Sequence, residues 1–118
     1  MEKEAAVAAL GALAQETRLE VFRMLVEAGP EGLPVGTIGK RLELPSPTLS
    51  FHLTQLRVAG LIGFRREGRS LIYSVRFEGM NALMAFLSEN CCGGNGSCPA
   101  APSCEPAALR RSAQRTEV

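Results

Sequence analysis

The segment from residue 46 to residue 77 constrains the fold most, because a helix pattern there runs directly into a hairpin pattern. Ser46-Pro47 predicts a helix start, since Ser can cap free amide groups and Pro at the first helical position loses no hydrogen bond. Three leucines then recur at the i, i+4, i+7 spacing of one buried helix face: Leu49, Leu53 and Leu56. The helix should end near Gly60.

Two β-rich runs follow this helix and flank a basic turn. The runs cover residues 61–64 and 71–77, and a segment containing Gly68 lies between them. This arrangement predicts a hairpin whose tip carries Arg65, Arg66 and Arg69.

Four further stretches predict helices around this unit. Each has apolar residues at helical spacing: Val7, Leu10 and Leu13; Leu19, Phe22, Leu25 and Val26; Val35, Ile38 and Leu42; Met80, Leu83, Met84 and Leu87. Gly29-Pro30 ends the second stretch, Leu44-Pro45 ends the third, and the last ends near Asn90. The chain should therefore be mainly α with a small β-hairpin, in the winged helix-turn-helix plan.

The last part of the chain differs in composition from the rest. Residues 91–118 contain all four cysteines and three prolines, with only Leu109 and Val118 as sizeable aliphatic residues. Such a segment buries too little apolar surface to offset its ordering entropy. We expect a DNA-binding and dimerisation domain over residues 1–90 and a flexible tail over residues 91–118.

Several functional classes are disfavoured by the sequence. No run approaches the eighteen or so apolar residues needed to span a membrane, so we expect no membrane partner. The start of the chain lacks the apolar core of a signal peptide, which favours the cytoplasm. No phosphate-cradling loop or carboxylate pair stands out, and the single His has no evident nucleophile, so we expect no enzyme.

Charge is unevenly distributed although the net charge of the 118 residues is only +1. Residues 40–76 carry seven Lys or Arg and two Glu, whereas the segments on both sides carry more acidic than basic residues. A basic centre between acidic ends can face a phosphate backbone on one side. On charge alone, an ordinary solvated surface fits equally well.

The helix that begins at Ser46 offers a polar outer face, because its leucines must face the core. Ser, Thr and Gln can hydrogen-bond base edges or phosphates in a major groove, and an arginine-bearing hairpin suits the minor groove or its phosphates. The candidate DNA contacts are Ser46, Pro47, Thr48, Ser50, Phe51, Thr54, Gln55, Arg65, Arg66 and Arg69.

Four residues near this surface have open alternatives. Phe51 points outward, where it can contact a thymine methyl group or pack locally. His52 borders the leucine face, and a structural hydrogen bond is favoured there over a ligand role. Lys40 and Arg41 either add contacts to the DNA backbone or form a solvated helix end.

Three segments together resemble the ArsR/SmtB family of metal- and metalloid-responsive bacterial repressors. They are Ala14-Gln15-Glu16-Thr17-Arg18-Leu19-Glu20-Val21-Phe22; Leu49-Ser50-Phe51-His52-Leu53-Thr54-Gln55-Leu56 with Ala59-Gly60-Leu61-Ile62; and Arg66-Glu67-Gly68-Arg69 with Tyr73. The resemblance covers about residues 5–90. It implies a homodimer that binds a palindromic operator in double-stranded DNA and leaves it when an inducer binds.

The resemblance also implies a dimer interface made by the first and last helices. The residues that would form it are Val7, Leu10, Met80, Leu83, Met84 and Leu87. Two of the family's inducer sites are absent, because residues 35–40 contain no Cys and residues 78–90 contain no His or Asp. Cys91, Cys92 and Cys98 resemble the subgroup that binds trivalent arsenic just past the last helix.

The chemistry of the cysteine cluster favours the same ion. Thiolates select soft ions, and three sulfurs suit the pyramidal geometry of As(III) or Sb(III), which leaves Cys104 dispensable. Gly93, Gly94 and Gly96 allow the backbone to return Cys98 to the first pair.

Two alternatives to this site stay open. All four cysteines could hold zinc or another soft metal, although the spacing lacks paired Cys-x-x-Cys motifs. A thiol-based redox switch on the same scaffold is the other alternative. A reducing cytoplasm and the strain of a bridge between adjacent cysteines both disfavour structural disulfides.

Overall fold

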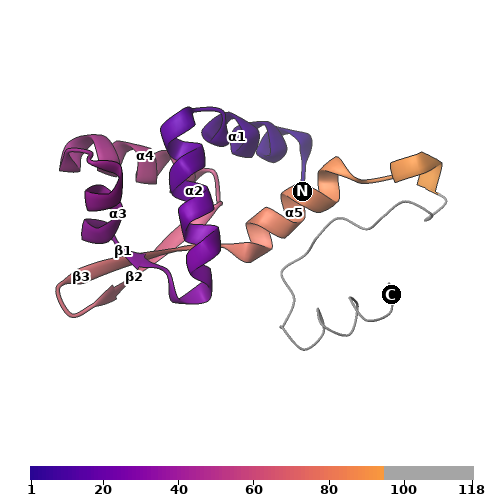
Figure 1. The fold of residues 1–118 in the computed structure, drawn as a ribbon. Coiled ribbons are helices and arrows are strands. Elements are labelled where there is room, and N and C mark those ends of the chain that lie inside the picture. Colours follow the sequence, from indigo (N-terminus) through magenta and orange to yellow (C-terminus); the bar gives the residue numbers. More distant parts are fainter. Residues whose placement is uncertain (95–118) are drawn as a thin grey trace, which may run out of the picture.

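The computed structural model describes residues 1–94 and shows a helical body with a β-hairpin at one end and a projecting helix at the other (Figure 1). The elements in chain order are α1 (Lys3–Leu13), α2 (Glu16–Ala28), the 3-10 turn η1 (Gly29–Glu31), β1 (Leu33–Pro34), α3 (Val35–Leu42), α4 (Ser46–Val58), β2 (Ile62–Glu67), β3 (Ser70–Val75), α5 (Phe77–Leu87) and the 3-10 turn η2 (Cys91–Gly94). All the expected helices and the hairpin are present. Within residues 1–94, no helix is both long and apolar enough to cross a membrane.

The small sheet has three strands in the order β1-β3-β2, all antiparallel. The sequence predicted β2 and β3 but not β1, whose two residues are too few to show an alternating pattern. β1 pairs Leu33 with Tyr73 and Pro34 with Ile72. Gly32 makes this approach possible, because a Cβ there would overlap the Tyr73 carbonyl oxygen and its φ is +72°.

The core lies where α2, α3 and α4 meet the base of the hairpin. Leu49, Leu53 and Leu56 are buried, as their spacing predicts, and they join the buried residues Val21, Leu25, Ile38, Leu61 and Ile62. The predicted inner face of α2 is partly wrong, since Leu19 and Val26 are exposed and Val21 is buried instead. The helix is rotated so that Val21 and Leu25 face the core.

The first helix packs through alanines rather than through its larger residues. Ala6, Ala9 and Ala12 are buried, and small side chains let α1 lie close against α2 and α4. Val7 and Leu10 remain outside, with 63% and 42% of their surface exposed. Val7 and Leu10 therefore lie on a face of α1 that stays exposed to solvent in the single chain.

The start of α4 differs by one residue from the expected cap. Pro45 occupies the cap position, and its carbonyl accepts the first hydrogen bond of the helix from the Leu49 amide at 3.0 Å. Ser46 is already helical, and no side chain caps the helix. The prediction that Ser46 caps α4 is therefore wrong, although the helix begins where the Ser-Pro pair indicates.

Candidate nucleic-acid interface

A tight turn sets α4 against α3 in the manner of a helix-turn-helix pair. Glu43 ends α3 in the left-handed conformation, with φ 54° and ψ 46°, and the Leu44 amide donates to the Gly39 carbonyl at 3.1 Å. A Cβ on Gly39 would lie 3.3 Å from a methyl group of Leu49, so this glycine lets the two helices approach. α4 is thereby the second helix of the pair, which in this plan reads the DNA major groove.

The predicted contact residues of α4 lie on its outer face. Ser46, Pro47, Thr48, Ser50, Phe51 and Thr54 are exposed, and Gln55 is half-buried. The first turn of α4 has no side-chain cap, so its free amides can also face a phosphate. The structure thus presents every predicted α4 contact to solvent on one accessible face.

Phe51 and His52 are neighbours with opposite environments. Phe51 is 57% exposed, whereas His52 is 9% exposed, and their rings meet edge to face with centroids 5.7 Å apart. Burial, followed by the nearby positive charge of Arg18, lowers the pKa of His52 below its ordinary value of 6.5. His52 is therefore a neutral interior side chain at neutral pH, in line with a structural role.

The expected hydrogen bond of His52 is not formed within residues 1–94. Its Nδ1 atom is buried without a partner there, and the same holds for the Nε atom of Arg18. Two nitrogens with unmet hydrogen-bonding capacity are thus buried between α2 and α4.

The three hairpin arginines have different settings. Arg65 and Arg66 lie on β2, opposite Ile72 and Leu71, so only Arg69 occupies the turn. Arg65 pairs with Glu67 at 2.7 Å and also donates to the Glu31 carbonyl at 2.9 Å. Placing Arg65 and Arg66 at the tip was therefore wrong, because both lie on β2. The bonds of Arg65 also tie it to Glu67 and to η1.

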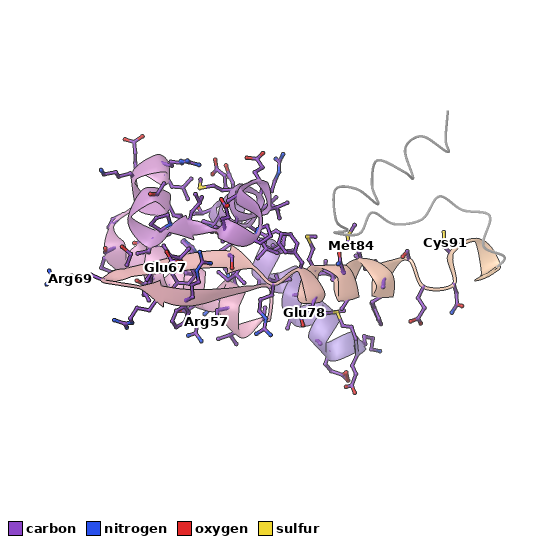
Figure 2. The ribbon with its side chains drawn as sticks, turned by 90° about the horizontal axis from the view of Figure 1, so that it is seen from below. Arg57, Glu67, Arg69, Glu78, Met84 and Cys91 are labelled. Atoms are coloured by element: carbon purple, nitrogen blue, oxygen red, sulfur yellow. The ribbon has the colours of Figure 1, made fainter. Side chains whose placement is uncertain are left out.

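The remaining two arginines are exposed on the hairpin, away from the core. Arg69 marks the far end of the hairpin in Figure 2, at the opposite end of the molecule from Cys91. The hairpin and the outer face of α4 therefore present basic and polar groups at one end of the domain.

The sequence reasoning missed an exposed pair beside this surface. The Arg57 guanidinium lies over the Phe64 ring at 5.7 Å from its centroid, and Phe64 is half exposed. The pair connects the last turn of α4 to β2. Strand alternation places Phe64 on the same face as the buried Ile62, so its exposure does not follow from spacing. Only the juxtaposition with Arg57 in space distinguishes the pair from solvated surface.

The predicted dimer residues divide into two groups. Val7, Leu10 and Leu87 are exposed, and Met80 and Met84 are half-buried. Leu83 is 5% exposed and belongs to the core of the single chain, so the prediction that it lies in the dimer interface is wrong. Leu83 faces inward because α5 packs one face on the body near α1.

The start of α5 is seated on the turn between α4 and β2. The Arg76 amide donates to the Leu61 carbonyl at 2.9 Å. A Cβ on Gly79 would overlap the Gly60 carbonyl oxygen. The backbone at the start of α5 therefore contacts the backbone of the turn that joins α4 to β2.

The first two cysteines follow α5 at its far end. The Ser88 hydroxyl donates to the Met84 carbonyl at 2.8 Å, Asn90 takes a φ of 58°, and the Cys91 amide donates to the Ser88 carbonyl at 3.0 Å. The Cys91 side chain is exposed. Cys98 and Cys104 lie outside the described residues, and residues 1–94 contain no cluster of three metal-binding side chains.

Comparison with known proteins agrees with this arrangement. The sequence model of a helix-turn-helix domain matches residues 13–62. The transcriptional activator HlyU of Vibrio cholerae is 36% identical over 97 residues, which are 80% of this chain and 87% of that protein. A putative arsenical resistance operon repressor of Halobacterium salinarum is 38% identical over 82 residues, 70% of this chain and 63% of that protein.

Solved structures show the same fold. HlyU of Vibrio cholerae superposes with a TM-score of 0.60 over 78% of this chain and 99% of its own, and its reduced form scores 0.58 over 75% and 90% at 34% identity. A homodimeric winged helix-turn-helix domain of Mycobacterium bovis scores 0.59 at 22% identity, over 81% and 89%. The chain belongs to the ArsR/SmtB family of winged helix-turn-helix transcriptional regulators, which are DNA-binding proteins and not enzymes.

Proposed function

We propose that this protein is a cytoplasmic homodimeric repressor that binds a palindromic operator of an arsenic-resistance operon. It leaves the operator when As(III) or Sb(III) binds Cys91, Cys92 and Cys98, while Cys104 is dispensable. The observation that carries the proposal is the exposed Cys91, which begins the 3-10 turn η2 four residues after Leu87, the last residue of α5.

The donor set fits a soft trivalent ion. Cys91 and Cys92 are adjacent in the sequence, and Cys98 is six residues after Cys92. Bound As(III) or Sb(III) supplies three bonds to sulfur, which would join the tail to the end of α5. Similarity to the putative arsenical resistance repressor of Halobacterium salinarum supports this choice.

The uncovered apolar face of α1 and α5 supports a homodimer. Val7, Leu10 and Leu87 expose apolar side chains on helices that contact each other. Burying such a surface against a second copy is favourable by about 25 cal/mol per Å². The homodimeric Mycobacterium bovis domain has the same fold.

A route from the cysteines to DNA runs along α5. Its far end precedes Cys91, and its near end rests on Gly60 and Leu61, between α4 and β2. A change in the orientation of α5 would therefore shift α4 and the hairpin together. Because half-sites are about one helical turn apart, a small change in helix separation in the dimer is enough to lose affinity.

The test is DNA-binding anisotropy with the region upstream of the protein's own gene, titrated with arsenite, antimonite, zinc and peroxide. We expect arsenite and antimonite to weaken binding about 10-fold or more, as a coupling free energy of about 1–3 kcal/mol allows. Cys91→Ser, Cys92→Ser and Cys98→Ser should abolish the response. Cys104→Ser is the matched control and should keep it, so loss in that variant would overturn the three-cysteine assignment.

A redox-responsive regulator is the second candidate, favoured by the exposed side chain of Cys91 and by similarity to a protein solved in a reduced form. In that case two thiols join in a disulfide and give two electrons and two protons to hydrogen peroxide, which becomes two waters. Release by peroxide without a response to arsenite would favour this function over metalloid sensing.

A further inference from the structure

A hollow of about 440 Å³ lies between the start of α3 and the end of the hairpin. Gly36, Thr37 and Lys40 line it from α3, and Arg69 and Ser70 line it from the turn and β3. A Cβ on Gly36 would have no atom within 4 Å, so the space beside this residue is open. Two elements far apart in sequence therefore enclose one open site.

The charge of this hollow is positive and uncompensated. Lys40 and Arg69 are exposed cations, its lining includes no carboxylate, and neither side chain forms an ion pair within residues 1–94. The hydroxyls of Thr37 and Ser70 add hydrogen-bond donors. Pro34, Val35 and Leu71 add uncharged apolar walls. The two cations and two hydroxyls are the part of the lining that fits a phosphate group.

The neighbouring Arg41 shows that this charge pattern is local. Arg41 lines a different hollow, of about 280 Å³, together with Glu20, Arg23 and Glu27 of α2. The lining of that hollow therefore holds two carboxylates for its two guanidinium groups. Helix α3 thus carries Arg41 in a hollow that contains carboxylates and Lys40 in a hollow that contains none.

The position of the hollow indicates the source of the phosphate. A second hollow of about 290 Å³ shares Gly36 and Lys40 with it and continues to Ser46, at the start of α4. DNA whose major groove receives the start of α4 would run its backbone past this continuous surface. The hollow is thus placed for a backbone phosphate beside the bases that α4 reads.

We propose that Lys40 and Arg69 together hold a single phosphate of the DNA backbone in this hollow. The site fixes the position of α4 on the duplex and adds affinity that does not depend on sequence. This inference rests on DNA binding but not on the response to arsenic, so the two can fail separately.

The experiment measures the dissociation constant for the upstream duplex and for an unrelated duplex at several salt concentrations, without arsenite. The variants are Lys40→Ala, Arg69→Ala and the double variant, with Arg41→Ala as the matched control. Each single variant should lower the slope of log K against log salt by less than one, equally for both duplexes, because the remaining cation still neutralises the phosphate. Because one phosphate is shared, the double variant should lower the slope by about one rather than two.

Clear outcomes would overturn the site. An unchanged slope in the double variant, a slope lowered by about two in the double variant, or a slope lowered by about one in Arg41→Ala would each contradict a shared phosphate contact. If the slope is unchanged while inorganic phosphate stabilises only the wild type against heating at matched ionic strength, the hollow binds a free anion instead. Lys40 and Arg69 are exposed, so equal melting temperatures in buffer should show that the variants fold.

Discussion

At the residue scale, His52 links burial to pH dependence. It is the only histidine, and its pKa in the folded protein lies below 6.5 because burial and Arg18 disfavour its charged form. The unfolded chain therefore binds more protons as pH falls, so this contribution to stability is complete above pH 6.5 and is lost below it. Urea unfolding from about pH 7.5 to about pH 5 should show this loss in the wild type and a smaller loss in His52→Gln. Equal losses would contradict it.

A second prediction at this scale concerns the turn between α3 and α4. Glu43 has a φ of 54°, a conformation that costs a residue with a Cβ about 1–2 kcal/mol. Glu43→Gly should therefore raise the free energy of unfolding by about 0.5–1 kcal/mol after the greater freedom of glycine in the unfolded chain is subtracted. Glu43→Ala keeps the Cβ and should bring no gain in denaturant unfolding. A similar gain in both variants would show that the charge, not the backbone, matters.

The environment of some single residues can be predicted from the sequence, whereas that of others cannot. The outward position of Phe51 and the burial of Leu53 follow from helical spacing alone. The Arg65 bonds to Glu67 and to the Glu31 carbonyl do not, because the latter joins residues 34 apart in sequence. Hydrogen bonds of this kind depend on the fold, so the sequence could not predict that Arg65 is held while Arg66 and Arg69 form no ion pair within residues 1–94.

At the element scale, periodicity predicts helices well and their rotation less well. Helical spacing in α2 permits faces centred on either side of Phe22, and packing against β3, α4 and α1 selects the face with Val21. β1 escapes prediction because two residues carry no pattern, and its pairing depends on Gly32. Elements are therefore predictable where one face repeats and unpredictable where a close backbone approach creates them.

The contact between α5 and the α4–β2 turn yields a prediction at this scale. Gly79→Ala places a Cβ against the Gly60 carbonyl, and no rotation of a side chain can relieve an overlap between backbone and Cβ. We expect a loss of about 1–3 kcal/mol in the free energy of unfolding, together with weaker DNA binding. Gly36→Ala is the matched control for stability, since its Cβ meets nothing within 4 Å and alanine favours a helix. Equal stability of the two variants would show that α5 is loosely seated.

At the scale of the whole molecule, the DNA-binding surface and the proposed inducer site lie at opposite ends. The hairpin turn with Arg69 and the exposed Cys91 lie at opposite ends of the domain (Figure 2). Helix α5 connects the end with Cys91 to the turn after α4. The uneven charge along the sequence pointed to the first end, and the cysteine cluster pointed to the second. Neither pattern indicated the backbone contact between them, because glycines carry no charge or hydropathy signal.

The central claim is that arsenite acts on a complete DNA-binding domain through cysteines outside it. The most direct measurement is the anisotropy of labelled upstream DNA with the whole chain and with residues 1–90 alone, each titrated with arsenite. Both proteins should bind DNA, and arsenite should release only the whole chain. Release of residues 1–90 by arsenite, or retention of the whole chain at saturating arsenite, would contradict the account.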